Sequence, residues 1–235
     1  MALARTRNSS RTYLHRFLVR AARAVSSGDL VLDAGAGRGR YRHLFAHARY
    51  ESADFVAVKG KKYEQPDYVC DLAHIPVEDA RFEHVVFTQV LEHLPDPGAV
   101  LRELRRVLVP GGRLWLTAPL TYAGHERPYD FFRYTRYGLR RLLDDAGFEV
   151  LEVEPLEGYF GTLSYAARHV SNNLPVTAEA YGGGAAGRGM ALAARAARRG
   201  AGPLATGLAR LDLRFKLTGT SFTKNFRAVA RRPAA

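Results

Sequence analysis

Two patterns of apolar residues alternate along this chain: short continuous runs, and residues at helical spacing. Short continuous apolar runs at residues 30–33, 84–90 and 113–119 predict buried parallel strands. Residues 149–153 alternate in the way that is typical of an edge strand. Leucines recur at helical spacing between these runs, and one such helix begins at Asp96-Pro97. Strands that alternate with helices predict an α/β fold.

Both flanks of this region carry amphipathic helical patterns. Residues 10–25 predict a helix with apolar side chains on one face and arginines elsewhere. Packing of this helix on the main domain is favoured over a position at a membrane surface. Residues 158–220 form a long excursion, in which 191–199 and 204–215 predict two short basic helices. A substrate lid ranks first as its role, and a membrane-leaning flap and solvated filler remain open.

The excess of basic residues lies at the two ends of the chain. The 235 residues suit one large α/β domain and carry a net charge of +12. Residues 1–30 hold six arginines against one aspartate, and residues 181–235 hold eleven Lys or Arg against one aspartate. The middle, 31–180, holds 18 basic and 21 acidic residues. This balance argues against a nucleic-acid cleft in the core, and the basic ends are suited to peripheral contact with an anionic membrane.

The cysteine content and the hydropathy of the chain indicate the cellular compartment of the protein. Cys70 is the single cysteine, so the chain has no internal disulfide and no cysteine-based zinc cluster. No apolar run reaches transmembrane length, and the stretch 14–25 is broken by charged residues, unlike a signal peptide. We therefore expect a cytoplasmic protein, with the membrane-peripheral alternative open. The oligomeric state is not predicted.

A glycine-rich turn follows the first predicted strand. Its glycines stand at alternate positions and allow a tight turn and the close approach of a ligand to the backbone. Tyr41 and later apolar residues at helical spacing predict a helix directly after the turn. Strand, turn and helix in this order build a cofactor site in open α/β sheets. The glycines of this turn are Gly35, Gly37 and Gly39.

The residue before the turn bears on the kind of cofactor. A dinucleotide fingerprint would place its third glycine at the position of Arg40. Asp33, at the tip of the strand, would repel a pyrophosphate, but its carboxylate suits a ligand with ammonium and sulfonium charges. S-adenosylmethionine is such a ligand, and backbone amides beyond the turn can receive its carboxylate.

Two further segments support the same cofactor. The run Glu103 to Pro119 (ELRRVLVPGGRLWLTAP) and the segment Gln89 to Pro97 join the glycine turn in a pattern that resembles class I S-adenosylmethionine-dependent methyltransferases. The resemblance covers about residues 30–155. It implies a Rossmann-like open sheet of about seven strands, mostly parallel, with an antiparallel last strand and helices on both faces.

The resemblance also implies a domain organisation. An N-terminal amphipathic region would occupy residues 1–28. The methyltransferase domain would comprise 29–157 and 221–232, because the family ends on an antiparallel hairpin whose last strand matches 221–231. Residues 158–220 would then be an insertion before that strand, as a lid or an interaction segment.

Cofactor contacts carry over from the family to individual positions. Asp54 would hydrogen-bond the ribose hydroxyls, and Asp71 the adenine amino group, with the backbone amide of Leu72 against the ring. Gln89 would border the cofactor. From the residues alone, Asp54 also fits a solvated loop acid and Asp71 a helix N-cap. The full predicted cofactor set is Asp33, Gly35, Gly37, Gly39, Asp54, Asp71, Leu72 and Gln89.

The loop at 120–135 carries the candidate chemistry for the acceptor. His125 would take a proton from a hydroxyl or amine nucleophile, with Asp130 or Glu126 orienting it or acting in its place. The alternative is a structural role for the loop, with the aromatic residues in the core. Glu92 and His93 are interpreted as loop-organising residues, with substrate contact as the alternative, and no metal is predicted. The predicted acceptor contacts are Tyr122, His125, Glu126, Tyr129 and Tyr134.

These features predict methyl transfer from S-adenosylmethionine to the oxygen or nitrogen of a small-molecule or lipid-linked acceptor. One alternative is a non-catalytic module that binds the cofactor or a partner. Another is a nucleic-acid methyltransferase that uses the basic C-terminal segment as a clamp. Residues 88–91 (TQVL) lack the acceptor-base motif expected of that class.

Overall fold

The computed structural model describes residues 8–56 and 63–234 and divides the chain into two compact units. The larger unit consists of Leu14–Leu156 and Asn225–Ala235. The smaller consists of Glu157–Lys224 together with the chain up to Tyr13. The two units are described separately below.

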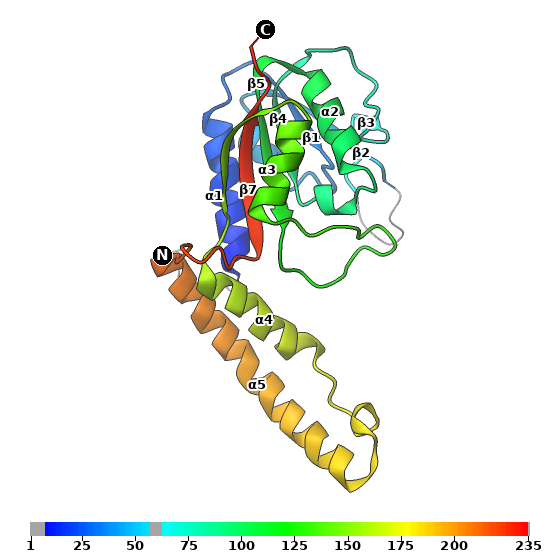
Figure 1. Ribbon diagram of the computed structural model, residues 1–235, viewed down its shortest axis with the longest axis vertical. Coiled ribbons are helices and arrows are strands. Elements are labelled where there is room, and N and C mark those ends of the chain that lie inside the picture. The colour runs from blue at the N-terminus through cyan, green and yellow to red at the C-terminus, as the bar shows by residue number, and fades with distance from the viewer. Residues whose placement is uncertain (1–7, 57–62, 235) are drawn as a thin grey trace. The chain divides into compact units, whose positions relative to one another are not determined.

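A seven-stranded sheet forms the larger unit, in the order β3-β2-β1-β4-β5-β7-β6 (Figure 1). The strands from β3 to β5 are parallel, whereas β7 runs antiparallel to both β5 and β6. This confirms the predicted fold class, including the antiparallel last strand and the edge position of β6. The strands are β1 (Leu30–Ala34), β2 (Arg49–Asp54), β3 (Tyr68–Val69), β4 (Phe82–Thr88), β5 (Leu108–Pro119), β6 (Glu149–Pro155) and β7 (Asn225–Arg231).

Helices cover both faces of this sheet, as predicted. Side chains alternate along β5, so Leu114 and Leu116 face the core that they share with α2 (Pro97–Val107) and α3 (Arg136–Asp145). Trp115 points to the other face, where its ring meets Phe17 of α1 (Ser9–Arg23) at 5.7 Å between centroids. The helix predicted over residues 10–25 is therefore packed on the sheet through the part of α1 in this unit.

The helix expected after the glycine turn is reduced to a single 3₁₀ turn, η2 (Arg42–Phe45). The connection between β1 and β2 is short, because β1 ends at Ala34 and β2 begins at Arg49. The glycine turn takes up the first part of this connection. Phe45 is the one residue of η2 that is buried, so little apolar surface is available to extend a helix.

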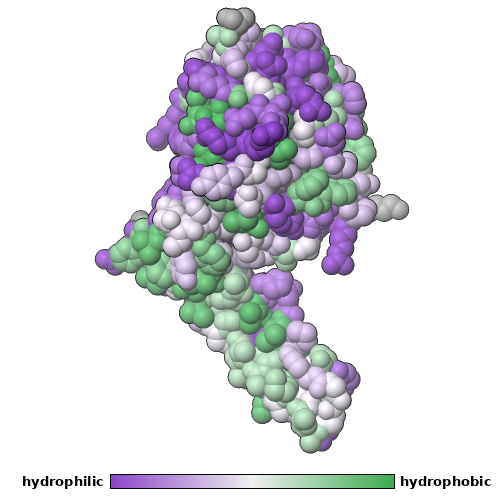
Figure 2. Space-filling view, viewed as in Figure 1, coloured by the Kyte–Doolittle hydropathy of each residue, from purple (hydrophilic) through white to green (hydrophobic). Residues whose placement is uncertain are grey.

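Two antiparallel helices dominate the smaller unit: α4 (Tyr159–Asn173) and α5 (Gly184–Phe215), joined through the 3₁₀ turn η4 (Glu179–Tyr181). The Ser164 hydroxyl donates to the Ala205 carbonyl at 2.7 Å, and Arg198 Nε donates to the Ser171 carbonyl at 2.9 Å. Figure 2 shows hydrophobic residues gathered along these helices on the face in view.

The prediction of two short helices in this segment is wrong, because α5 runs through 32 residues without a break. Pro203 and the glycines beside it favour an interruption by propensity. A stripe of buried alanines instead lets α5 lie close against α4 along its length, and this packing outweighs the local preference. The stripe consists of Ala191, Ala194, Ala201, Ala205 and Ala209. In the described ranges, no helix is both long and apolar enough to span a bilayer.

Candidate active site

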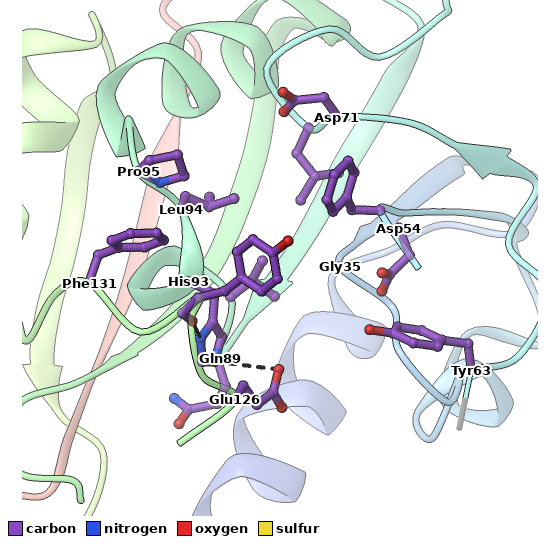
Figure 3. A pocket seen from close by; sticks show the side chains of 14 residues that line it. Gly35, Asp54, Tyr63, Asp71, Gln89, His93, Leu94, Pro95, Glu126 and Phe131 are labelled. Carbon is purple, nitrogen blue, oxygen red and sulfur yellow. Dashed lines mark hydrogen bonds and ion pairs between the residues drawn. The ribbon is translucent and has the colours of Figure 1, made fainter. Parts of the chain in front are cut away.

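A cavity of about 260 Å³ opens at the carboxyl ends of the parallel strands in the larger unit. Its walls include Gly35 after β1, Asp54 at the end of β2 and Gln89 after β4. The strand order reverses between β1 and β4, and ligands of open α/β sheets bind at such a switch point. Figure 3 shows the side chains that converge on this space.

The glycine turn approaches the cavity closely at its first residue. Gly35 lines the cavity and has a φ of +76°, and a Cβ atom built there would lie 2.4 Å from Val90 Cγ2. Only glycine therefore fits this position without moving Val90. Gly37 and Gly39 do not line the cavity. The Gly37 backbone N–H donates to Asp54 Oδ2 at 2.8 Å, which ties the turn to the end of β2.

Asp33 lies behind the turn and does not line the cavity. Its side chain is 7% exposed and accepts a hydrogen bond from the Tyr50 hydroxyl at 2.5 Å. Burial raises the pKa of this carboxyl to about 6, and the nearby charge of Asp54 acts in the same direction. Asp33 is still ionised at neutral pH, so it contributes negative potential to the turn from a buried position.

The other predicted cofactor residues do line the cavity. Asp54 accepts hydrogen bonds from the backbone of Gly37 and Val56 and reaches the cavity wall. Asp71 accepts the Ala73 backbone N–H at 2.9 Å within a turn, and it faces the cavity beside Leu72. The helix N-cap alternative is wrong, because the described residues 70–81, between β3 and β4, form no helix. The contact of Asp71 with adenine stays a prediction.

Two cavity residues hold left-handed backbone conformations without being glycine. Gln89 has a φ of +57° and Glu126 a φ of +50°. Such strain gathers at functional sites, where the surrounding structure holds it in place. The Gln89 backbone N–H donates to the Thr117 carbonyl at 2.9 Å, and its side-chain amide donates to Thr117 Oγ1 at 3.1 Å. Strand β5 thus fixes the direction of Gln89.

The loop after β5 supplies the wall opposite the glycine turn. Glu126 and Tyr129, both predicted acceptor contacts, line the cavity. Glu126 Oε2 lies 3.9 Å from His93 Nε2, as the dashed line in Figure 3 shows. Sequence reasoning missed several lining residues of the cavity. Val90, Leu94 and Pro95 follow β4, whereas Phe131 lies on the loop after β5. The missed residues are Tyr63, Val90, His93, Leu94, Pro95 and Phe131, together with Phe55 near β2.

The remaining predicted acceptor residues stand back from the cavity. His125 does not line it, and its ring packs edge-on against His93 and Tyr122 at centroid distances of 4.6 and 4.7 Å. Burial lowers the pKa of His125. Tyr134 is 5% exposed and donates its hydroxyl to the Leu91 carbonyl at 2.9 Å, a placement that favours the structural alternative.

Asp130, predicted to assist proton transfer, braces its own loop. Its carboxylate accepts hydrogen bonds from the Arg133 guanidinium at 2.7 and 3.0 Å and from the His125 backbone N–H at 2.9 Å. Arg133 holds the pKa of Asp130 far below its usual range. A group that stays ionised in this way is a poor proton acceptor, so the geometry favours an orienting role.

Comparison with known proteins agrees with this geometry. Residues 32–116 match the model of a methyltransferase domain family. A probable S-adenosylmethionine-dependent methyltransferase of Mycolicibacterium smegmatis is 31% identical over 156 residues, which cover 61% of each chain. Three curated relatives are matched over 61%, 47% and 37% of their own length.

Solved structures share the fold at lower identity. The 1,6-didemethyltoxoflavin-N1-methyltransferase of Burkholderia thailandensis, solved with bound 1,6-didemethyltoxoflavin and S-adenosylhomocysteine, has a TM-score of 0.52 at 18% identity. That alignment covers 92% of this chain and 78% of the other. The [4+2]-cyclase SpnF has a TM-score of 0.53 at 21% identity, over 96% and 81% of the two chains.

The sheet order, the glycine turn and the cavity at the switch point define a class I methyltransferase fold. Residues 32–116 match the methyltransferase domain family, and the probable S-adenosylmethionine-dependent methyltransferase of Mycolicibacterium smegmatis is a sequence relative of this chain. The match and the fold agree with the predicted resemblance to class I S-adenosylmethionine-dependent methyltransferases.

Proposed function

We propose that this chain binds S-adenosylmethionine in the cavity and transfers its methyl group to a small-molecule or lipid-linked acceptor, at oxygen or nitrogen. One observation carries the proposal. Gly35, Asp54, Asp71, Leu72 and Gln89, five of the eight predicted cofactor residues, line a single cavity at the switch point of the sheet.

The acidic residues and Leu72 each have a defined task under the proposal. Asp54 accepts the ribose hydroxyls, while Asp71 and the backbone of Leu72 meet the adenine. Asp33 and Asp54 give the site a negative potential that attracts the ammonium and sulfonium charges of the cofactor. Sulfonium is an activated donor, so the protein mainly aligns the donor with the acceptor and excludes water.

The acceptor wall favours an organic molecule over a polyanion. Leu94, Pro95 and Phe131 make it largely apolar, with Tyr129 and the carboxylate of Glu126 as polar groups. This composition is typical of small-molecule sites. A nucleic-acid backbone would instead meet the carboxylates of Asp54, Asp71 and Glu126, which disfavours the alternative of a nucleic-acid methyltransferase.

Isothermal titration with S-adenosylmethionine and S-adenosylhomocysteine tests the cofactor half of the proposal. We expect the wild-type chain to bind both and Asp54→Asn to bind at least about 10-fold more weakly, because a charged hydrogen bond to the ribose is lost. Asp145→Asn, at an exposed ion pair on α3, is the matched control and should bind as wild type. No binding of either ligand to the wild type would refute the proposal.

Cofactor binding without methyl transfer is the second candidate, because SpnF, with this fold, is a cyclase. A screen with methyl-labelled S-adenosylmethionine over phenols, alcohols, amines and lipid-linked sugars separates the two. Transfer to any of these classes supports the enzyme. A silent screen together with tight cofactor binding would favour the non-catalytic module.

A further inference from the structure

Two histidines and a buried glutamate meet beside the cavity, on segments that the predicted cofactor set does not use. The 3₁₀ turn η3 (Leu91–His93) follows β4 and carries Glu92 and His93. The loop after β5 brings His125 to the same place and is tied there by a hydrogen bond from the Phe131 N–H to the Glu92 carbonyl at 2.9 Å. One ligand atom from each of the three side chains lies within 4.8 Å of the others.

The cluster contains buried polar atoms that lack a hydrogen-bond partner. Glu92 is 1% exposed, and its Oε2 has no hydrogen-bond partner. Nδ1 of His125 is buried and also lacks a hydrogen-bond partner, and it lies 3.7 Å from Asp130 Oδ1. Glu92 Oε1 lies 3.8 Å from His93 Nε2, so the carboxyl is directed into the cluster. Leaving such groups unsatisfied destabilises the fold, and more so when a group is charged. A cation among them would satisfy both.

The ring of His93 is already oriented as a ligand. Its Nδ1 is in hydrogen-bond contact with the Tyr129 carbonyl, which accepts only from a protonated nitrogen. The Nε2 lone pair is therefore directed toward Glu92 at 3.8 Å and Glu126 at 3.9 Å. Metal-bound histidines almost always donate their other ring N–H to a carbonyl or carboxylate in this way.

We propose that Glu92, His93 and His125 form a binding site for a divalent transition-metal ion at the edge of the cavity. Two imidazoles and one carboxylate suit Zn²⁺, Co²⁺, Fe²⁺ or Mn²⁺ better than Mg²⁺ or Ca²⁺, which prefer all-oxygen ligands. Bonds of about 2.0–2.2 Å require the three ligand atoms to draw together to about 3.3 Å, by small rotations of the side chains.

The position of the site would bring a bound metal ion close to the acceptor. Three protein ligands leave at least one coordination position open, as in catalytic zinc sites. His93 and Glu126 both line the cavity, so the site borders it. Glu126 is close enough to His93 to act as a further ligand. A bound ion would lie within reach of an acceptor oxygen, a consequence that rests on the proposed methyl transfer.

Metal binding is tested directly on the full chain, prepared without a histidine tag and stripped with a chelator. Co²⁺ is titrated while its visible d–d absorption is recorded, and Zn²⁺ binding is measured by competition. We expect one ion per chain. His125→Gln and Glu92→Gln should weaken Co²⁺ binding by more than about 100-fold, because each removes a ligand. His15→Gln, an exposed histidine of α1, should bind as wild type.

Folding and cofactor binding are measured on the same samples, so that the outcomes can be separated. A wild-type chain that binds S-adenosylmethionine but takes up no stoichiometric Co²⁺ overturns the metal site and leaves the proposed function intact. A wild-type chain that binds Co²⁺ but not S-adenosylmethionine supports the metal site and refutes the proposed function. Equal Co²⁺ affinity of His125→Gln and wild type also overturns the site, provided that both give the same circular dichroism.

Discussion

Asp33 contributes negative potential to the proposed cofactor site but lowers the stability of the fold, so Asp33→Asn is expected to weaken that potential and to stabilise the chain. The carboxyl is buried at the end of β1, and its pKa rises from the ordinary value of 3.8 to about 6 because of that burial. A difference of about two pKa units corresponds to about 3 kcal/mol. Asparagine has no charge to bury and keeps an oxygen for the Tyr50 hydroxyl.

The sign of the pH dependence follows from the direction of this shift. Because the folded chain holds the Asp33 proton to a higher pH than the unfolded chain, ionisation lowers the free energy of unfolding between about pH 4 and pH 6. The loss persists at higher pH. Asp33→Asn should therefore match wild type near pH 4 and exceed it by about 2–3 kcal/mol at pH 8.

Urea unfolding followed by tryptophan fluorescence measures this difference. Trp115, the only tryptophan, is buried on β5 and reports on the larger unit. Asp145→Asn serves as the control and should change stability by less than about 1 kcal/mol at either pH, since its ion pair is exposed. The reasoning is refuted if Asp33→Asn is less stable than wild type at pH 8, or if its effect does not change with pH.

Three further predictions follow from the structure. Gly35→Ala should lower stability and abolish S-adenosylmethionine binding in titration, because its Cβ would meet Val90 at 2.4 Å; Gly219→Ala, with open space around it, should change neither. Pro203→Ala should slow amide hydrogen exchange in α5, since proline inside a helix costs up to about 3 kcal/mol; unchanged exchange would contradict this. The chain should bind to phosphatidylserine vesicles through the arginines of α5, and high salt should release it. Equal binding to neutral vesicles would show that the attraction is not electrostatic.

Much of the larger unit was predictable because local and long-range preferences agree there. The apolar runs became the central strands, and Asp96 caps α2 by accepting the Ala99 N–H at 2.9 Å, with Pro97 at the first helical position. Disagreement arose where the two preferences conflict. The apolar spacing after Tyr41 favours a helix, but the short connection between β1 and β2 leaves room for one turn only.

The helix α5 shows the same conflict in the opposite direction. Pro203 and the flanking glycines predict a break, and no local signal outweighs them. The alanine stripe keeps the helix continuous only because it packs against α4, the other helix of the hairpin. Helix propensity sums over neighbours in sequence, whereas this stabilisation depends on a partner that sequence periodicity does not identify.

Residues at strand ends were the predictable part of the site. Asp54 ends β2, Asp71 lies two residues beyond β3 and Gln89 directly follows β4. Parallel strands bring their carboxyl ends to one edge of the sheet, where these residues line the cavity. His93, Tyr63 and Phe131 reach the cavity through loop conformations instead. Positive φ values at Gln89 and Glu126, which sequence patterns do not reveal, set the direction of two of these segments.

The cluster of Glu92, His93 and His125 was not predicted as a metal site because the register between β4 and β5, which brings these residues together, cannot be read from the sequence. Glu92 and His93 are adjacent, but His125 is distant in sequence and was assigned to proton transfer. Thr88 pairs with Thr117, so the segments that leave both strands start at the same level of the sheet. His93 and His125 then meet a few residues later, at 4.6 Å between ring centroids. A one-residue slip would turn Gln89 away from the cavity, so the same pairing that positions the cofactor wall also assembles the cluster.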